Sequence, residues 1–477
     1  MGLIEPSDGF LDGVAAVTDR AGYIGGSAPE AAPYLAEPRD RWQGRAAAVL
    51  RPRSTEEVAA ILRLASAARV GVIPVSGGTG LVGGQTIEEG ATPIVLSLER
   101  MSTIRAVLPE DGALVAEAGA VLEDVHKAAA EAGRLFPLSM ASQGSCRIGG
   151  NLATNAGGVQ VLRYGNARDL CLGVEAVMAD GSVHHGLKAL RKDNTGYDLR
   201  HLLIGSEGTL GVITAAMLKL FPAPGEVVTA MLSVESPAAA VTLFHVLRAR
   251  LGEGISAFEL IARRGPDFVA EVFPERTDPL PGNPEWRVLL ELTGPAEAGL
   301  SARADAVFAA LFEEGLALDG VLASSEAQRG AMWWLREHIP EANRRIGGVS
   351  HHDISVPIAR VPAFIEDGIR DLALIDQGLR VNCFGHLGDG NLHYNVFPPP
   401  GGRRADYVHL RDRIKEAIHD RVHAHGGSVS AEHGVGRLKT ADLVKYGDPA
   451  KLAAMRAIKA ALDPHGILNP GAVVPPA

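Results

Sequence analysis

Two histidines flank a turn signal in the segment FGHLGDGNLHYN, and their spacing could place a metal ion. His386 and His393 lie on either side of Asp389-Gly390. Asp-Gly is a strong signal for a two-residue β-turn. With such a turn, His386 would lie directly opposite His393 on one face of the hairpin, with Cβ atoms roughly 4.5–5.5 Å apart. Two imidazoles at that separation suit one ion bound at about 2.0–2.1 Å.

The same register would place Phe384 opposite Asn395. A candidate third ligand follows in SAEHG, where Glu432 stands beside another histidine, His433. The segment taken alone leaves two interpretations open, which are a metal site and a pair of surface histidines in a hairpin.

A glycine-rich loop, PVSGGTGLVGG, occupies residues 74–84 after a predicted strand. Gly78, Gly80 and Gly83 match GxGxxG, but the Rossmann motif requires a helix to open at the loop. The residues that follow, GGQTIEEGATP, have no helical face. Consecutive backbone amides after a strand can still bind a pyrophosphate. The alternative is a tight structural turn.

A second run of small residues, GGNLATNAGG, spans residues 149–158, and a third, GSEGTLGVI, spans residues 205–213. Small residues allow the backbone to lie flat against a planar ligand, and the polar members could hydrogen-bond its heteroatoms. A packed crossover between domain halves would produce the same composition.

The elements that must position these loops follow from periodicity. Ser54 predicts a helix N-cap with Glu57 as its capping-box partner. The apolar face of this helix is predicted to be Val58, Ile61, Leu62 and Ala65. A hairpin is expected around Asp180-Gly181, and the Pro-rich residues 222–225 predict a domain boundary. Loose alternation of strands and helices with hairpin signals favours α+β over a doubly wound parallel sheet.

Composition narrows the function classes. The 477 residues imply more than one domain, and a formal net charge of −10 argues against nucleic-acid binding. Three cysteines without a CxxC pattern fit a reducing compartment. We see no signal peptide and no apolar run that could span a membrane. We therefore expect a cytoplasmic location, with peripheral membrane contact left open.

Nine ordered motifs resemble the FAD-linked oxidases of the vanillyl-alcohol oxidase superfamily (PCMH type), in the branch of D-2-hydroxyglutarate and D-lactate dehydrogenases. The resemblance runs from about residue 45 to the C-terminus. The motifs are PVSGGTGLVGGQ, SQGSCRIGGNLATNAGG, RYGNARDLCLGVEAVMADG, DLRHLLIGSEGTLGVIT, WWLRE, HDISVP, FGHLGDGNLHYN, SAEHGVG and LDPHGILNPG.

This resemblance implies an α+β fold with a two-lobed PCMH-type FAD-binding domain at residues 1–222, including an N-terminal helical extension. A substrate-binding cap domain with a ferredoxin-like antiparallel sheet would follow at 223–465. A C-terminal tail at 466–477 would return to the FAD domain.

The resemblance also implies the residues that hold FAD. With no histidine near the 76–84 loop, the attachment is expected to be non-covalent. The implied FAD-binding residues are Pro74, Ser76, Gly77, Gly78, Thr79, Gly80, Leu81, Gly84, Gln85, Pro137, Ser142, Gly149, Asn151, Thr154, Gly158, Ile213 and Asn469.

By the same resemblance, His386, His393 and Glu432 would hold a divalent metal, and zinc is the metal expected. Such a set leaves one coordination position open for a substrate. The 2-hydroxyl and one carboxylate oxygen of a D-2-hydroxy acid would chelate there. His433 is implied as the general base that removes the hydroxyl proton.

Three further residues are expected to bind substrate carboxylates, namely Arg336, Asn395 and His351. The chain departs from the D-2-hydroxyglutarate pattern at two positions. Pro340 stands where a threonine is typical, and His351 stands where a lysine is typical. D-2-hydroxyglutarate, D-malate and D-lactate therefore all stay open as substrates.

The implied activity is oxidation of a D-2-hydroxy acid to the 2-oxoacid. Electrons would pass to an electron-transfer flavoprotein or a quinone, and a homodimer is expected. Two alternatives share the fold. One is a non-redox flavoenzyme like alkyl-dihydroxyacetone-phosphate synthase, and the other is a flavin-binding subunit like that of glycolate oxidase.

Overall fold

The computed structural model describes residues 2–39 and 41–475, which form two compact units. Unit 1 comprises residues 1–158, 165–223 and 432–477, and unit 2 comprises residues 159–164 and 224–431. The predicted boundaries at 222 and 465 did not anticipate that residues 432–465 would group with unit 1. They also did not anticipate that residues 159–164 would group with unit 2. Residues 476 and 477 of the predicted tail lie outside the described residues.

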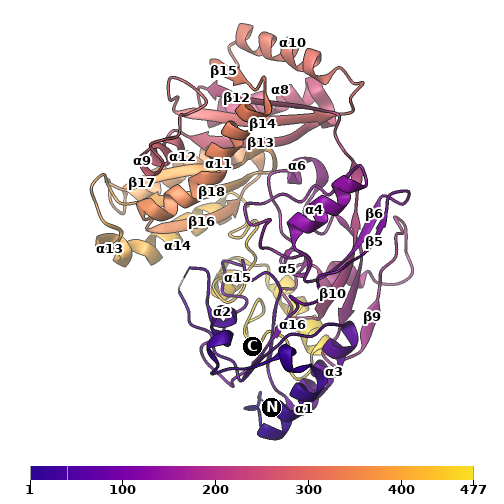
Figure 1. The fold of residues 1–477 in the computed structure, drawn as a ribbon. Coiled ribbons are helices and arrows are strands. Elements are labelled where there is room, and N and C mark those ends of the chain that lie inside the picture. The colour runs from indigo at the N-terminus through magenta and orange to yellow at the C-terminus, as the bar shows by residue number, and fades with distance from the viewer. Residues whose placement is uncertain (1, 40, 476–477) are drawn as a thin grey trace. The chain divides into compact units, whose positions relative to one another are not determined.

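The first sheet of unit 1 has the order β1-β2-β4-β3. It lies in the indigo-to-purple part of the ribbon in Figure 1. Its strands are β1 (Tyr23–Gly25), β2 (Ala48–Leu50), β3 (Val72–Val75) and β4 (Ile94–Ser97). Strand β4 pairs in parallel with β2 and β3. Helix α3 (Thr55–Ala68) connects β2 to β3, so the glycine-rich loop begins where β3 ends.

Helix α3 forms as its sequence predicts. The Ser54 hydroxyl accepts a hydrogen bond from the Glu57 amide at 3.2 Å. The Glu57 carboxylate reaches back to the Arg53 amide at 2.8 Å, one residue before the expected partner. All four residues of the predicted apolar face are fully buried, Val58, Ile61, Leu62 and Ala65.

The second sheet of unit 1 is antiparallel, with the order β5-β6-β10-β8-β9. Its strands are β5 (Ile104–Leu108), β6 (Ala113–Glu117), β8 (Cys171–Val177), β9 (Val183–His185) and β10 (Val212–Lys219). Strands β8 and β9 confirm the predicted hairpin around residues 180–181. The small strands β7 (Arg134–Leu135) and β11 (Phe221–Pro222) also pair.

The C-terminal part of unit 1 packs against the first sheet. The Val72 amide donates to the Ile467 carbonyl, and the Asn469 amide donates to the Val72 carbonyl, both at 2.8 Å. Ile467 and Leu468 are fully buried.

The other helices of unit 1 are α1 (Asp8–Val17), α2 (Ala32–Leu35), α4 (Leu122–Glu131), α5 (Ile148–Ala153), α7 (Leu199–Leu203), α15 (Thr440–Tyr446) and α16 (Pro449–Leu462).

Unit 2 is built on one seven-stranded sheet with the order β15-β12-β14-β13-β17-β18-β16. Every neighbouring pair in this sheet is antiparallel. Its strands are β12 (Glu226–Val234), β13 (Ile255–Ala262), β14 (Trp286–Gly294), β15 (Asp319–Leu322), β16 (Ser350–Ser355), β17 (Arg380–His386) and β18 (Asn391–Phe397).

Helices cover both faces of this sheet. One face packs against α8 (Pro237–Leu251), α10 (Leu300–Glu313), α12 (Val361–Ala373) and α14 (Arg411–Ala424). The other face packs against α9 (Arg264–Val272) and α11 (Glu326–Ile346). Unit 2 also contains α6 (Val161–Tyr164) and α13 (Arg404–Tyr407). Because both faces are covered, β13 and β14 are almost wholly buried, and any charged side chain within them must have a partner.

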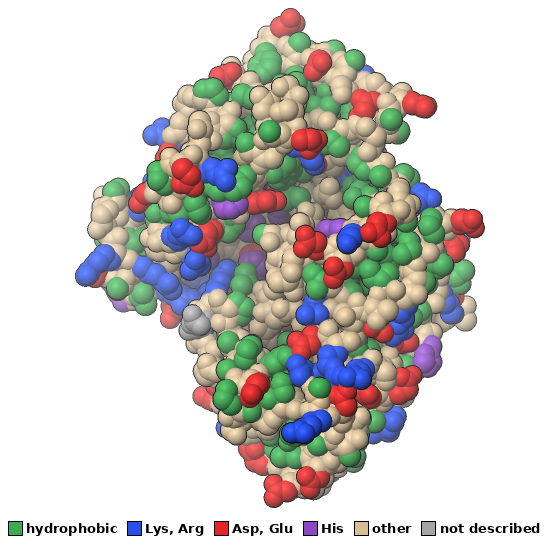
Figure 2. All heavy atoms as spheres, viewed as in Figure 1, with side chains coloured by type: hydrophobic (Ala, Val, Ile, Leu, Met, Phe, Trp, Pro, Cys, Tyr) green, Lys and Arg blue, Asp and Glu red, His purple; other side chains and the backbone are tan. Residues whose placement is uncertain are grey.

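The surface of unit 2 carries a local basic cluster although the chain is acidic overall. Figure 2 shows Lys and Arg side chains near α13, where Arg403 and Arg404 are exposed. Within residues 2–39 and 41–475, no helix is long and apolar enough to cross a membrane.

Candidate functional site

The hairpin that carries the two histidines differs from its prediction in register. Phe384 pairs with His393, and Asn382 pairs with Asn395. The expected pairs, His386 with His393 and Phe384 with Asn395, are therefore wrong by two residues. The connection takes four residues, because Leu387–Asp389 forms a 3₁₀ turn that Gly390 ends.

Local hydrogen bonds explain this longer turn. The Gly390 amide donates to the Leu387 carbonyl at 3.2 Å, and the Asp389 carboxylate accepts from the Asn391 amide at 3.1 Å. Gly390 has φ of +81°, in the left-handed region. Since side chains alternate between faces with a period of two, a shift of two residues leaves His386 and His393 on the same face.

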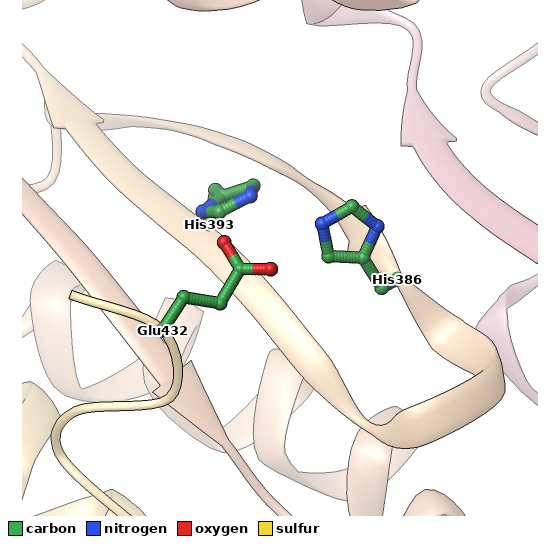
Figure 3. A group of neighbouring side chains, drawn as sticks. All are labelled: His386, His393 and Glu432. Carbon is green, nitrogen blue, oxygen red and sulfur yellow. The ribbon is translucent and has the colours of Figure 1, made fainter. Parts of the chain in front are cut away.

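His386, His393 and Glu432 come together as the sequence predicts (Figure 3). One potential ligand atom from each lies within 4.8 Å of the others. The two imidazole centroids are 5.6 Å apart, and the rings are inclined by 79°. Figure 3 shows the Glu432 carboxylate directed toward both rings. Two nitrogens and a carboxylate oxygen form a donor set that suits a catalytic zinc ion.

The chain path explains where Glu432 lies. Ala431, the last residue of unit 2, donates its amide to the Asp353 carbonyl on β16 at 3.4 Å. Asp353, Glu432 and His433 also bring ligand-type atoms within 4.8 Å of one another. His433 therefore lies beside the buried carboxylate of Asp353.

His386 and Arg336 share the carboxylate of Glu259, a residue that the sequence patterns did not identify as functional. Glu259 on β13 approaches His386 Nδ1 with Oε1 at 2.5 Å and accepts from Arg336 Nε with Oε2 at 2.6 Å. Burial alone would raise the pKa of the Glu259 carboxyl, but its close contacts with Arg336 and His386 hold that pKa at about 2. The available signal was a lone carboxylate in an otherwise uncharged buried strand, ISAFELIA.

The remaining predicted substrate residues, His351 on β16 and Asn395 on β18, pair across these two neighbouring strands. His351 Nδ1 is 2.8 Å from Asn395 Oδ1. The Asn395 amide nitrogen donates to the carbonyls of His393 and Asn382, at 3.1 Å and 3.4 Å. Pro340 lies inside α11, one turn after Arg336. Contact of His351 and Asn395 with a substrate carboxylate stays a prediction.

The glycine-rich loop of unit 1 fits the predicted pyrophosphate site. Within the described part of the chain, the backbone amides of residues 76–85 donate no hydrogen bond. The loop is held through other atoms, since Ser76 Oγ donates to the Ala118 carbonyl and Gln85 Nε2 donates to the Gly78 carbonyl, both at 2.9 Å. Amides left without a partner beside open space are suited to an anion.

A cavity of about 890 Å³ opens beside this loop. Four predicted FAD residues line it, Ser76, Gly77, Gly78 and Gln85. Its lining contains three arginines, Arg20, Arg51 and Arg147, and two glutamates. One of these glutamates, Glu99, pairs with Arg51 at 3.1 Å. The loop and cavity therefore suit a nucleotide diphosphate.

The other predicted FAD residues lie in the same unit, but several have structural contacts that explain their identity. A Cβ on Gly149 would lie 2.6 Å from Ala118 Cβ, and one on Gly158 would lie 1.8 Å from the Ser139 carbonyl oxygen. These two glycines fit the alternative of a packed crossover. Pro137 and Ile213 are buried. The Ser142 carbonyl accepts hydrogen bonds from nearby backbone amides, and the Thr154 hydroxyl donates one to a carbonyl in the preceding turn. Asn151 Nδ2 lies 3.6 Å from Cys146 Sγ.

The segment that follows His433 is anchored within unit 1. Glu207 accepts hydrogen bonds from the amides of Val435 and Gly436, at 2.7 Å and 2.8 Å. Burial raises the pKa of Glu207, whereas these amides act in the opposite direction. Arg437 donates to the carbonyls of Gly83 and Gly84 and to Asn469 Oδ1. The predicted phosphate loop, Asn469 and the 435–437 segment thus form one hydrogen-bonded cluster.

Comparison with known proteins gives matches along nearly the whole chain. Residues 46–186 match the family described as "FAD binding domain", and residues 223–473 match "FAD linked oxidases, C-terminal domain". D-2-hydroxyglutarate dehydrogenase of Xanthomonas citri pv. viticola is 39% identical over 90% of both chains. The mitochondrial D-2-hydroxyglutarate dehydrogenase of Bos taurus is 40% identical over 91% of this chain and 78% of its own.

Solved structures give the same architecture. p-Cresol methylhydroxylase with substrate bound aligns with a TM-score of 0.77 at 17% identity, over 97% of this chain and 96% of its own. Alkyldihydroxyacetonephosphate synthase aligns with a TM-score of 0.71 at 17% identity, over 98% and 86%. At this identity the two likenesses show the fold alone, and they confirm the predicted α+β PCMH-type class.

Proposed function

The chain belongs to the FAD-linked oxidases, and from this premise we propose that it is a dehydrogenase that oxidises D-2-hydroxy acids to 2-oxoacids. The curated relatives are D-2-hydroxyglutarate dehydrogenases and share nearly the full length of the chain. The structural observation that carries the proposal is the group of His386, His393 and Glu432, which Glu259 links to the buried Arg336. A 2-hydroxy acid presents a chelating pair of oxygens and an anionic group, which match these two features.

Each residue has a distinct task in this proposal. His386, His393 and Glu432 hold a divalent metal, which we propose to be zinc. They leave coordination positions on this metal for the substrate oxygens. Arg336 binds a carboxylate, and His433 accepts the hydroxyl proton as hydride leaves C2. When bound, FAD supplies the two-electron acceptor and the metal lowers the pKa of the substrate hydroxyl. We propose non-covalent FAD, held by the amides of residues 76–85.

The choice among D-2-hydroxy acids is part of the proposal. The names of the relatives favour D-2-hydroxyglutarate, whereas Pro340 and His351 keep D-malate and D-lactate as candidates. We further propose a homodimer that reduces an electron-transfer flavoprotein or a quinone in the cytoplasm. The synthase reaction suggested by one structural neighbour gains no support, because that likeness at 17% identity concerns the fold.

The test is turnover of the purified flavoprotein with an artificial electron acceptor and a panel of paired D- and L-2-hydroxy acids. Hydroxyglutarate, malate and lactate would each be assayed after chelator treatment and after readdition of zinc. We expect one D-acid to be oxidised, its L-enantiomer to be inert, and zinc to restore the activity lost to the chelator. Equal rates with and without metal, or no oxidation by flavin-loaded and zinc-loaded protein, would reject the proposal.

A further inference from the structure

The carboxylate of Glu259 lies between two functional groups that reach the site from different elements. Glu259 is fully buried in β13, Arg336 comes from α11, and His386 ends β17. One carboxylate oxygen lies 2.5 Å from His386 Nδ1, and the other accepts from Arg336 Nε at 2.6 Å. A single buried side chain therefore fixes both partners.

The contact with His386 selects which ring nitrogen can bind a metal. At 2.5 Å the Glu259 carboxyl oxygen and His386 Nδ1 share a hydrogen bond, so this contact occupies Nδ1. Nε2 is then left as the lone-pair donor. Figure 3 shows one ring nitrogen of His386 facing the Glu432 carboxylate and the other turned away from it. Carboxylates in this position orient metal-binding histidines and raise their basicity.

The contact with Arg336 leaves its terminal nitrogens available. Nε is occupied by Glu259, while the guanidinium carbon lies 4.8 Å from the centre of the Phe384 ring. Among the described residues, Nη1 and Nη2 of Arg336 donate no hydrogen bond to another side chain or carbonyl. Fixed by the carboxylate and the ring, the planar group presents two parallel N–H donors, which match a substrate carboxylate.

We propose that Glu259 is a positioning residue that holds the metal-binding nitrogen of His386 and the carboxylate-binding face of Arg336 in one arrangement. The proposal rests on the function proposed above and deepens it, because it assigns a shared support to the metal and the substrate carboxylate. A neutral amide cannot replace Glu259, since it has one acceptor oxygen and would turn an N–H₂ group toward one of two donors.

The same sheet offers a matched control. Glu291 on the neighbouring strand β14 is also buried, and its Oε2 accepts from Arg329 Nε and Trp333 Nε1 of helix α11, each at 2.9 Å. Glu291 thus links the same helix to the same sheet without contacting His386 or Arg336. A general loss of helix packing would affect both variants, whereas the proposed role is specific to Glu259.

The experiment uses full-length flavoprotein variants Glu259→Gln, Arg336→Met, Glu259→Gln/Arg336→Met and Glu291→Gln. Zn²⁺ affinity is measured by competition with a chromophoric chelator, and 2-oxoglutarate affinity is measured by calorimetry at saturating Zn²⁺. Neither readout requires turnover. Melting temperatures and flavin content show whether each variant is folded.

We expect Glu259→Gln to weaken Zn²⁺ binding by about 10–100-fold and also to weaken 2-oxoglutarate binding. Arg336→Met should weaken 2-oxoglutarate binding but leave the Zn²⁺ Kd within about twofold of the wild type. The double variant should lose Zn²⁺ affinity as Glu259→Gln does, and Glu291→Gln should change neither constant. If Glu259→Gln alone fails to fold, comparison of the double variant with Arg336→Met gives the same answer.

An unchanged Zn²⁺ Kd in Glu259→Gln would overturn the proposal. Recovery of wild-type Zn²⁺ affinity in the double variant would also overturn it, because the loss would then come from the unpaired Arg336 charge. Failure of the wild type to oxidise any D-2-hydroxy acid would reject the proposed function and leave these binding comparisons intact.

Discussion

At the scale of single residues, the site depends on side chains that lie far apart in the sequence. His386 and His393 could be recognised because one hairpin carries both. Glu259 could not, because 127 positions separate it from His386 and only the β13–β17 pairing joins them. Spacing in the sequence identifies residues that meet within one hairpin or helix. Residues that meet through pairing of distant strands can be identified only from the fold.

A substitution of His433 can distinguish a role in proton transfer from a role in metal binding. We predict that His433→Gln lowers the rate of flavin reduction by about 10²–10⁴-fold, the usual contribution of a general base. Zn²⁺ content should stay that of the wild type, because His386, His393 and Glu432 remain. The measurement pairs rapid-mixing absorbance with elemental analysis. Loss of zinc together with activity would show that His433 is a ligand instead.

Arg336 tests carboxylate recognition. We predict that Arg336→Lys raises KM for the D-2-hydroxy acid by about tenfold or more, since hydrogen bonds to charged groups contribute about 1.5–3 kcal/mol. A lysine cannot keep the contact with Glu259 and also form the paired donors. Arg329→Lys on the same helix is the control, and steady-state kinetics should show its KM unchanged. Equal effects of the two substitutions would refute this role.

At the scale of elements, periodicity predicted α3 and its buried face, because a helix with a clear cap depends on local sequence. The β17–β18 hairpin was predicted in kind but not in register. The Asp-Gly signal favours a two-residue turn, yet hydrogen bonds within residues 387–391 stabilise a longer one. The functional face was still predicted because the shift was even.

An alanine substitution at Gly390 tests the backbone geometry of this turn. A Cβ there would lie 2.1 Å from the Val356 carbonyl oxygen, whereas Gly401, with a similar φ of +79°, has no atom within 4 Å. We predict that Gly401→Ala costs about 1–2 kcal/mol of unfolding free energy through backbone strain alone. Gly390→Ala should cost about 1–3 kcal/mol more because of the overlap. Denaturant unfolding of both variants measures the difference, and equal losses would contradict the described turn.

At the scale of the whole molecule, composition and turn signals predicted an α+β chain with a boundary near residue 222. They did not predict that residues 432–465 group with unit 1, because the contacts responsible are distant. The Val435 amide and its acceptor Glu207 are 228 positions apart. Neither residue belongs to a periodic pattern, so only the folded structure reveals this anchor.

Burial across both units can be tested through the thiols. Cys146, Cys171 and Cys383 are all buried and free of disulfides. Burial raises the pKa of the Cys171 thiol to about 12, and it also raises the pKa of Cys146 and Cys383. Since the thiolate is the reactive form, we predict no reaction with a thiol reagent at pH 8 in the native protein and reaction of all three after denaturation. Rapid labelling of native protein would contradict the described cores.

The most direct test of metal-assisted oxidation at C2 is the anaerobic single-turnover reduction of the flavin by a D-2-hydroxy acid carrying deuterium at C2. We predict that absorbance near 450 nm bleaches in the zinc-loaded protein, that deuterium slows this bleaching, and that chelator abolishes it. Bleaching that proceeds at the same rate without metal, or no bleaching by any D-acid in flavin-loaded and zinc-loaded protein, would contradict the account.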